Sequence, residues 1–250
     1  MKKKKIIIIV IIIIISICLL IYLRYKPVAV LGYHGFTTEK DPHDNLIINI
    51  DKFEEQLKYL KEHNYHTLTL NELYEYKQGK RILPLKSVLI TIDDGYQSNY
   101  DLAFPLLKKY DMNAVVFYIG ENINKENSPY MTKDTIKKIK KEYKNIEIAS
   151  HSYSLHNEGS INQDKKKLKE DFKKMNKIIP SKFYAYPYGA YNENIIEVLK
   201  EEEYKLAFTF GPSKNHRKMY YFDNNYKIPR LNISNDMPLW KFKLRLNLPF

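Results

Sequence analysis

Hydrophobic residues follow two different patterns along this chain of 250 residues. Positions 6–23 form one apolar run that is interrupted only by Ser16 and Cys18. Beyond it, short apolar stretches alternate with segments in which apolar residues recur every three or four positions. The run is just long enough for a helix to span the roughly 30 Å hydrocarbon core of a membrane. The alternation predicts an α/β domain that begins near residue 28.

Predicted strands and predicted helices alternate throughout this domain. Strands are expected at residues 28–31, 88–92, 114–119, 146–149, 183–186, 206–208 and 228–233. Helices are expected at residues 51–62, 100–110, 133–142, 163–178 and 193–203. Repeated strand–helix units predict a parallel sheet, and about seven of them favour a barrel or near-barrel. In such folds the catalytic residues lie at the carboxyl ends of the strands.

Charges on either side of the apolar run predict its orientation. Lys2–Lys5 precede the run, whereas only Arg24 and Lys26 follow it closely. This difference favours cytoplasmic lysines and an extracellular domain. A cleaved secretory signal is the alternative, but its apolar region usually covers only about 7–15 residues and ends at a small-residue site, which is missing here. We therefore expect residues 1–27 to form an uncleaved, single-pass transmembrane anchor in the cell membrane.

Composition and charge narrow the possible partners. The formal net charge is +12, and the part beyond residue 26 holds 35 basic against 29 acidic residues, or +6. Such a domain would be attracted to anionic cell-envelope polymers or to a membrane surface. No nucleic-acid-binding module is recognisable, so we expect no nucleic-acid partner. Because the single cysteine lies in the predicted span, no intrachain disulfide is expected. We expect a monomer.

Polar clusters follow four of the predicted strands. They are Gly32-Tyr33-His34, Asp93-Asp94-Gly95, the segment from His151 to His156, and Pro187-Tyr188-Gly189. A helix cap or a turn would explain any one of them alone. Because the carboxyl ends of parallel strands meet at one rim, the four together predict an active site.

Two of these clusters predict a metal site. Asp93 and Asp94 can converge on one centre because Gly95 lets the backbone turn, so that one binds a metal and the other takes a proton. His151 and His156 are five residues apart, and only a loop could direct both at one ion. Two imidazoles and one carboxylate leave positions open for water and substrate, which is typical of catalytic zinc. Cobalt, nickel, manganese and iron are alternatives to zinc.

These clusters resemble the motifs of polysaccharide deacetylases, the NodB-homology group also called carbohydrate esterase family four. Residues 91–95 resemble the first motif of the family and residues 185–189 the third. Residues 151–156 resemble the second motif in the longer-spaced form of the biofilm poly-N-acetylglucosamine deacetylase branch. The match extends from about Val28 to Leu231. It implies a distorted (β/α) barrel, in agreement with the strand count.

The resemblance also implies roles for individual residues. Asp93 would be the general base, and the metal ligands would be Asp94, His151 and His156. The backbone N–H of Tyr188 would help to form the oxyanion hole.

This sequence departs from the family pattern in two places. Most members carry an Arg where Ala185 stands, and that Arg steadies the catalytic Asp. Arg230, at the end of a later predicted strand, is the candidate to replace it. Many members also take a catalytic His from a C-terminal motif, but no His follows His216 here. The biofilm branch places it in an N-terminal Tyr-His motif, which Tyr33-His34 fits, so His34 is the expected general acid.

Aromatic residues near the motifs are candidate sugar-binding faces, because a ring offers a flat apolar surface. The candidates are Tyr153, Tyr186, Tyr188, Tyr191 and Trp240, and Tyr153, Tyr186 and Pro187 are the expected substrate contacts. In the expected domain organisation, residues 28–85 form the first part of the catalytic domain, which contains the Tyr-His motif. Residues 86–250 would form the NodB-homology core.

The expected function is metal-dependent hydrolysis of N-acetyl groups on an extracellular amino-sugar polymer, either poly-N-acetylglucosamine-like or peptidoglycan, with release of acetate. One alternative is an esterase that acts on an O-acetylated polysaccharide through the same site. Another is a catalytically inactive, membrane-anchored glycan-binding protein, which the Ala185 departure would favour. The intact set Asp93, Asp94, His151 and His156 argues against the inactive protein, because a binding module needs no base beside a metal.

Overall fold

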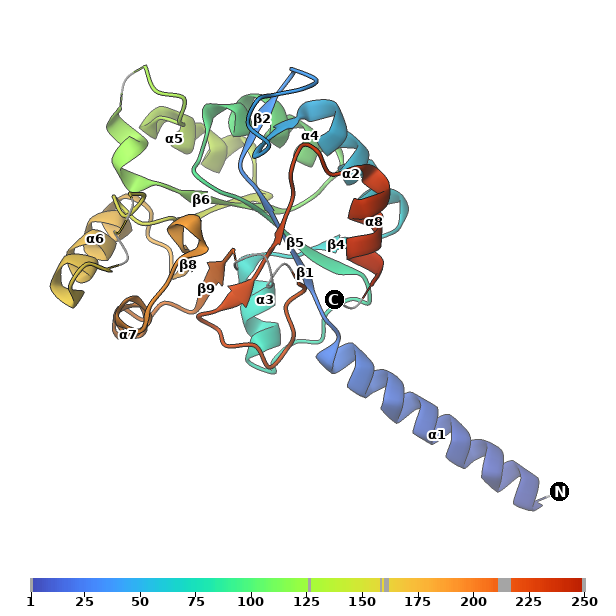
Figure 1. The fold of residues 1–250 in the computed structure, drawn as a ribbon. Helices are drawn as coiled ribbons and strands as arrows, with labels where there is room; N and C mark the ends of the chain where they lie inside the picture. Colours follow the sequence, from blue (N-terminus) through green and yellow to red (C-terminus); the bar gives the residue numbers. More distant parts are fainter. Residues whose placement is uncertain (1, 126, 158, 160–161, 211–216, 249–250) are drawn as a thin grey trace.

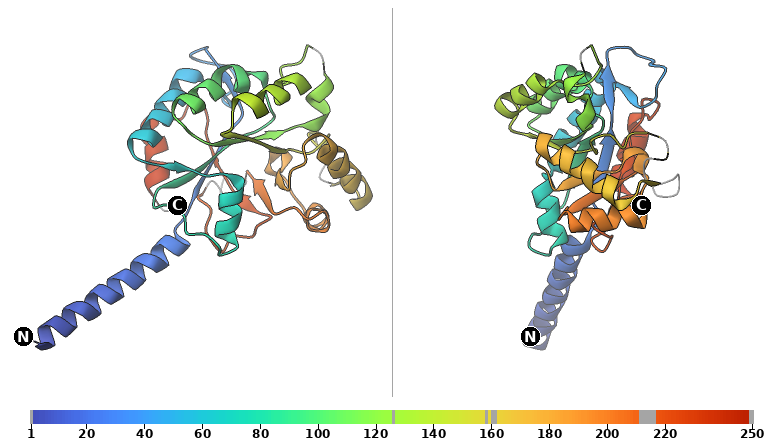
Figure 2. Two further views of the ribbon diagram at one scale, coloured as in Figure 1. Left: turned by 180° about the vertical axis from the view of Figure 1, so that it is seen from behind. Right: turned by 90° about the vertical axis from the view of Figure 1, so that its left-hand side faces the viewer.

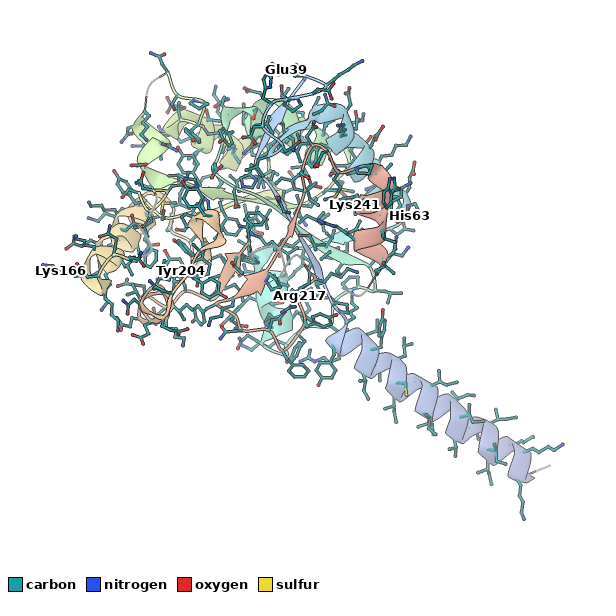
Figure 3. All side chains as sticks on the ribbon, viewed as in Figure 1. Glu39, His63, Lys166, Tyr204, Arg217 and Lys241 are labelled. Carbon is teal, nitrogen blue, oxygen red and sulfur yellow. The ribbon has the colours of Figure 1, made fainter. Side chains whose placement is uncertain are left out.

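The computed structural model describes residues 2–125, 127–157, 159, 162–210 and 217–248. Helix α1 (Lys2–Tyr25) projects from the remainder of the chain as a single long rod (Figure 1). Its side chains stand clear of the domain along most of its length (Figure 3). Residues Lys3–Tyr25 are long and apolar enough to cross a membrane, a property that signal sequences near an N-terminus share.

Eight parallel strands form a nearly closed barrel, as predicted from the strand–helix alternation (Figures 1 and 2). In spatial order these are β10 (Ile228–Pro229), β9 (Leu206–Thr209), β8 (Phe183–Ala185), β7 (Ile146–Ser150), β6 (Ala114–Tyr118), β5 (Ser87–Ile92), β1 (Ala29–Tyr33) and β11 (Leu231–Asn232). A ninth strand, β4 (His66–Thr67), pairs with β5 beside this path. A separate pair is formed by β2 (Gly35–Thr37) and β3 (Ile47–Asn49).

The seam of the barrel lies at Arg230. The sequence predicts one strand at residues 228–233, but the structure has two short strands there, β10 and β11. These two strands occupy opposite ends of the sheet order, and only Arg230 separates them in the chain. The chain therefore crosses from one sheet edge to the other at this residue, which interrupts the strand.

Helices cover the outside of the barrel. The predicted ones are α2 (Ile50–Glu62), α4 (Phe104–Lys109), α5 (Lys133–Glu142), α6 (Lys165–Ile178) and α7 (Glu193–Glu201). A π-helical turn (Asn99–Ala103) precedes α4, so the helix expected at 100–110 has two parts. Two further helices, α3 (Leu70–Lys77) and α8 (Leu239–Asn247), were not predicted, because each is short.

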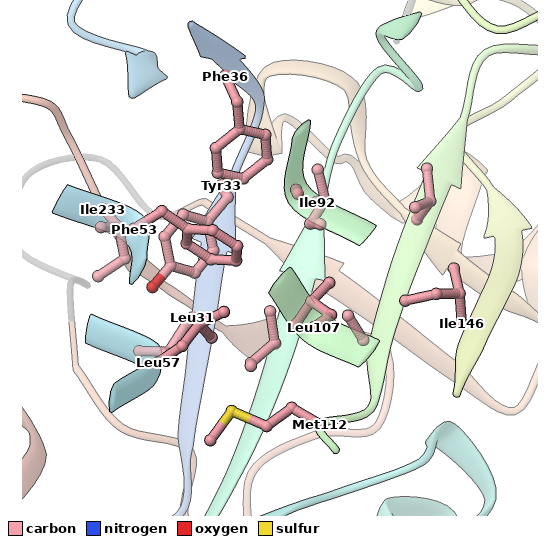
Figure 4. Close-up of a cluster of buried hydrophobic side chains, with 14 of the residues drawn as sticks. Leu31, Tyr33, Phe36, Phe53, Leu57, Ile92, Leu107, Met112, Ile146 and Ile233 are labelled. Atoms are coloured by element: carbon pink, nitrogen blue, oxygen red, sulfur yellow. The ribbon is translucent and has the colours of Figure 1, made fainter. Parts of the chain in front are cut away.

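Alternation along the strands divides the core into an outer and an inner part. On β1, Leu31 and Tyr33 face the covering helices, and they pack with Phe53 of α2 and other apolar side chains (Figure 4). Val30 belongs to a second cluster inside the barrel, together with Leu89 of β5. Because successive strand residues point to opposite faces, the residues at alternate positions after Leu89 also face the interior. This alternation directs Thr91 and then Asp93 inward.

The two ends of the barrel have different neighbours. Helix α1 leads into the amino end of β1, which begins three residues after Lys26. His34 follows the carboxyl end of β1, and Asp93 follows the carboxyl end of β5, the parallel neighbour of β1. The polar clusters predicted from the sequence therefore lie at the end of the barrel opposite to α1.

Candidate active site

A cavity of about 330 Å³ lies at the carboxyl ends of the strands. Residues from several different strands and from the loops that follow them line it. They are His34, Leu46, Asp93, Asp94, Tyr96, His151, His156, Tyr188, Phe210 and Asn232. The structure thus brings together the four polar clusters that the sequence placed at one rim.

Asp93 is paired with Arg230 at the base of this cavity. The two guanidinium nitrogens of Arg230 donate to the two carboxylate oxygens of Asp93, at 2.6 and 2.7 Å. One of them also donates to Thr91 Oγ1 at 3.2 Å. Both partners are buried. Burial alone would raise the pKa of Asp93, but Arg230 holds it below its usual value. The carboxylate is therefore kept ionised and fixed in orientation.

Asp94, His151 and His156 form a compact group of possible metal ligands. One ligand atom from each lies within 4.8 Å of the others. Oδ1 of Asp94 lies 3.5 Å from Nε2 of His151 and 3.3 Å from Nε2 of His156. This oxygen is buried and receives no aligned hydrogen bond from the residues that the structure describes. The backbone at Asp94 is left-handed, with φ of +69°. Oδ2 of Asp93 lies 3.9 Å from the same Nε2 of His151, so both carboxylates face this imidazole.

The hydrogen bond at the other nitrogen of His151 fits a metal ligand. Nδ1 of His151 lies 2.8 Å from the carbonyl oxygen of Ala185, to which it can only donate. Nε2 then carries the lone pair, and it faces the Asp94 oxygen. A carboxylate and two imidazoles are a donor set that suits zinc and related divalent metals. The residues present therefore fit a divalent cation.

The charged residues around Asp94, His151 and His156 also favour the binding of a cation. Burial alone would raise the pKa of Asp94, but His151 and His156 hold it well below its usual value. Burial alone would lower the pKa of His151, but Asp93 and Asp94 raise it. Two buried carboxylates thus stabilise added positive charge where the imidazole nitrogens converge.

The loop after β7 turns sharply enough to direct both histidines to one point. Ser152 has a left-handed backbone, with φ of +69°, directly after His151. Its hydroxyl oxygen accepts a hydrogen bond from the N–H of Leu155 at 3.0 Å, which draws His156 back toward the rim. This loop is the arrangement that the five-residue spacing predicted.

Helix α6 holds the same loop through Asp171. One carboxylate oxygen of Asp171 accepts from the N–H of Tyr153 at 2.8 Å, and the other accepts from the N–H of Ser154 at 2.8 Å. The hydroxyl of Ser154 also donates to the second oxygen at 3.2 Å. Asp171 is buried. Both of its oxygens are therefore used to fix the two residues at the centre of the loop between the histidines.

His34 lines the same cavity as the possible metal ligands. Its ring stacks on Phe210, with centroids 5.5 Å apart and an interplanar angle of 19°. The guanidinium of Arg230 lies 3.7 Å from the centroid of the same Phe210 ring. A Cβ at Gly32 would lie 2.3 Å from that ring, so glycine leaves the space that Phe210 occupies. The ring of Phe210 thus contacts both His34 and Arg230 and forms an apolar wall of the cavity.

Burial also changes the acidity of His34. It lowers the pKa of the imidazole, and Arg230 and His151 add to this effect, whereas Asp93 and Asp94 oppose it. Nδ1 is buried without a hydrogen-bond partner in the described part of the chain. A lowered pKa makes the protonated form a stronger proton donor.

The expected substrate contacts lie in different places. Tyr188 is 62% exposed and its ring lies 4.5 Å from that of His156, so it stands at the mouth of the cavity. Tyr186 and Pro187 are buried away from the cavity, and the hydroxyl of Tyr186 donates to the carbonyl of Tyr226 at 2.9 Å. Tyr153 does not line the cavity either. The ring of Tyr186 packs in the apolar cluster between β8 and the outer helices, so it does not line the cavity.

Four residues that line the cavity were missed by sequence reasoning. They are Leu46, Tyr96, Phe210 and Asn232. Tyr96, Phe210 and Asn232 each lie at or within four residues of the carboxyl end of a strand, so the rule that predicted the other clusters could have found them. Leu46 lies in the connection before β3 and carried no such signal.

The sequence is similar to proteins of known activity. A sequence model of the family described as polysaccharide deacetylase matches residues 80–207. The poly-beta-1,6-N-acetyl-D-glucosamine N-deacetylase of Staphylococcus aureus (strain MSSA476) is 34% identical over 212 residues, which cover 77% of this chain and 69% of that protein. The protein of the same name from Staphylococcus epidermidis is 32% identical over 233 residues, covering 82% and 78%.

Solved structures share the fold. The Streptococcus pyogenes deacetylase PplD, in complex with acetate, superposes with a TM-score of 0.79 at 21% identity, covering 90% of this chain and all of that one. IcaB from Ammonifex degensii gives a TM-score of 0.73 at 23% identity, covering 89% and 98%. With the family match and relatives that are 32–34% identical over most of their length, the chain belongs to the polysaccharide deacetylase family of enzymes.

Proposed function

We propose that this protein is a metal-dependent N-deacetylase that acts on an extracellular polymer of the poly-N-acetylglucosamine class. The observation that carries the proposal is one cavity in which a buried, arginine-paired Asp93 adjoins the group Asp94, His151 and His156. The curated relatives named above are N-deacetylases of that polymer, which supports the choice of substrate.

The metal would be held by Asp94, His151 and His156, and the two imidazoles favour zinc among divalent ions. When bound, such an ion acts as a Lewis acid toward the acetyl carbonyl and toward water. The hydrogen bond from His151 to the carbonyl of Ala185 keeps that ring in the orientation needed for binding.

Asp93 would act as the general base. It takes a proton from the attacking water as the new carbon–oxygen bond forms. Arg230 is its positioning residue, because the guanidinium keeps the carboxylate ionised and aimed into the cavity. Most family members carry an arginine at the position of Ala185. The small side chain of Ala185 leaves room inside the barrel for the side chain of Arg230.

His34 would act as the general acid. It donates a proton to the leaving nitrogen as the carbon–nitrogen bond breaks, so that the sugar departs as a neutral amine and the acyl group as acetate. The backbone N–H of Tyr188 would donate to the acetyl oxygen as negative charge develops there. Tyr188 and the next residue, Gly189, both have left-handed backbone, with φ of +56° and +67°, which turns the chain at this rim.

In this proposal residues 1–27 anchor the protein in the cell membrane. Residues 28–85 supply the general acid, and residues 86–250 supply the base and the metal ligands. The length and composition of α1 support the anchor, and the placement of the cavity at the far end of the barrel directs it away from the bilayer. N-terminal sequencing of the protein from membranes should find the intact start of the chain. A mature chain that begins near residue 27 would exclude the anchor.

Acetate release tests the proposed activity. The purified full chain, supplied with zinc, should release acetate from N-acetylated β-1,6-glucosamine oligomers, and an Asp93→Asn variant should not. Faster release from an O-acetylated polysaccharide would instead identify an esterase. Binding of the oligomers without any acetate release would identify a glycan-binding protein.

A further inference from the structure

A second cavity lies at the end of the barrel next to α1. Its volume is about 480 Å³. Tyr22 in the last turns of α1 and Ala29 and Ser87 at the amino ends of β1 and β5 line it, together with Leu246 of α8. The catalytic residues follow the opposite, carboxyl ends of β1 and β5. This cavity is therefore separate from the active site, and it adjoins the proposed membrane anchor.

Three lysines line this second cavity, and two of them are buried. Lys26 is 3% exposed and Lys218 is 6% exposed. Lys26 Nζ donates to the carbonyls of Pro84 and Leu85, and Lys218 Nζ donates to the carbonyl of Leu246 at 2.7 Å. An ammonium group has three donors. In the described part of the chain these bonds leave donor capacity on both groups.

Lys86 is the third lysine, and it stands at the exposed side of the cavity. Its Nζ donates to the carbonyl of His63 at 3.2 Å and lies 5.7 Å from the ring centroid of Tyr65, which also lines the cavity. Three cationic side chains from well-separated parts of the sequence thus converge on one space.

In the described part of the chain, no carboxylate side chain that lines the cavity balances these charges. Among its described lining residues there is neither an aspartate nor a glutamate. Burial and, to a smaller extent, the neighbouring ammonium of Lys218 together lower the pKa of Lys26 to about 8. Burial also lowers the pKa of Lys218. Buried charges are normally paired, so two repelling buried cations mark a place where a bound anion would be stabilised.

The position of the cavity identifies the source of the anion. Tyr22 and Tyr25 lie at the domain end of the apolar helix, where tyrosines typically mark the headgroup region of a bilayer. Tyr25 stacks on Phe222 at 5.1 Å, and Arg24 donates to the carbonyl of Arg81 at 3.0 Å, so this end of α1 is packed against the domain. The cavity lies beside this end of α1, so anchoring by α1 would bring it next to the lipid headgroups.

We propose that the cavity lined by Lys26, Lys86 and Lys218 binds the phosphate of an anionic phospholipid from the leaflet next to the domain. The inference rests on the proposed anchoring by α1. A lipid bound there ties the amino end of the barrel to the bilayer at a second point beside the anchor. It thereby holds the catalytic cavity, at the opposite end, facing away from the membrane and toward the exported polymer.

Lipid binding by the full chain in neutral detergent tests this site. The probes are dihexanoylphosphatidylglycerol, dihexanoylphosphatidylcholine, glycerol 1-phosphate and inorganic phosphate, with binding measured by calorimetry. We expect phosphatidylglycerol to bind more tightly than the other three, because only it combines a net negative charge with acyl chains that contact the apolar surface near α1. Lys86→Gln should weaken its binding about fivefold, the usual contribution of one basic residue near an anionic headgroup.

Matched variants separate a site from general charge attraction. Lys80→Gln removes an equally exposed lysine that lies outside the cavity, and it should leave the affinity unchanged. Lys218→Met removes a buried lysine and should nearly abolish binding, provided that its circular dichroism spectrum matches that of the parent. Equal effects of Lys86→Gln and Lys80→Gln would overturn the site.

Two further outcomes would overturn the proposal. Equal binding of phosphatidylglycerol and phosphatidylcholine would remove the preference for an anion. Inorganic phosphate or glycerol 1-phosphate binding as tightly as phosphatidylglycerol would make the ligand a soluble phosphate and exclude the lipid. Extraction of cell membranes with alkaline carbonate tests the anchor separately. Release of the protein there refutes the anchoring, whereas retention together with a failed lipid preference refutes the lipid site alone.

Discussion

Arg230 reaches the buried carboxylate of Asp93 from the seam of the barrel, with hydrogen bonds of 2.6 and 2.7 Å to its two oxygens. The two residues lie 137 positions apart in the chain. Their contact depends on barrel closure, because Arg230 stands where the chain passes between the two edge strands. A bidentate pair of this kind fixes both the charge and the orientation of the carboxylate. Closure of the barrel therefore also sets the orientation of the Asp93 carboxylate.

Replacing Arg230 should affect stability and catalysis in different ways. Arg230→Gln leaves a buried carboxylate without its cation, which typically destabilises a protein by about 3–5 kcal/mol. Arg230→Lys retains the charge but not the two-point contact, so we expect a folded enzyme with kcat lower by about 100-fold. Thermal unfolding and acetate-release kinetics measure the two effects. A Lys variant with full activity would mean that the charge alone is sufficient.

The same substitution should shift the pH dependence of the reaction. Burial alone raises the pKa of Asp93, and Arg230 is the largest influence that lowers it. A general base acts only when it is deprotonated. Weakening the pair therefore moves the acid limb of kcat/KM to higher pH, so that Arg230→Lys loses activity earlier than the parent as the pH falls. An unmoved acid limb would separate Arg230 from the ionisation of the base.

Metal content should depend on the three converging ligands. We expect one divalent ion per chain, and His151→Ala or His156→Ala should each remove most of it. Asp93→Asn should retain the ion, because Asp93 is bound to Arg230 rather than included in the ligand group. Metal analysis of the purified variants measures this. Stoichiometric metal in the His151→Ala, His156→Ala double variant would place the site elsewhere.

Asp171 should influence the metal site from outside the cavity. An Asp171→Asn variant keeps the size of the side chain but leaves one loop N–H facing an amide that cannot accept it. The loop between the histidines then loosens, and zinc affinity should fall about tenfold, as is usual when an outer partner of a ligand is lost. Zinc titration against a chelator measures this fall. Glu170→Gln, on the exposed face of α6, is the matched control and should bind zinc normally.

The residues at the rim could be predicted because the signal for each one is the apolar strand that directly precedes it in the sequence. Asp94 and His151 follow strands whose apolar runs are plain, and parallel strands bring their ends together without further information. The position of Tyr186 directly after β8 did not reveal that its ring would pack in the cluster outside the sheet. Closeness to a motif in the sequence therefore did not predict which side chains contact the cavity.

The remaining features depend on contacts between distant segments. Phe210 becomes a wall of the active site only because Gly32, on a different strand, leaves space for its ring. Lys26 and Lys218 carry no motif, and they share a cavity only because both flank the amino end of the barrel. Such pairs follow from the three-dimensional closure of the sheet, so no pattern within one segment predicts them.

His34 provides the most demanding test of the proposed mechanism, because its role rests on the Tyr-His motif and on its place in the lining of the cavity. If it protonates the leaving nitrogen, His34→Ala should slow N-deacetylation by about 10²–10⁴-fold, the range that a general acid usually contributes. The same variant should hydrolyse an activated acetyl ester, such as 4-nitrophenyl acetate, at nearly the parent rate, since that leaving group departs without protonation. His43→Ala, at an exposed position outside the cavity, is the control and should change neither rate. Equal losses on both substrates would instead indicate that His34 orients the acetyl group or stabilises its oxygen. Unchanged rates on both substrates would remove His34 from the reaction and, with it, the assignment of the N-terminal Tyr-His segment to the catalytic machinery.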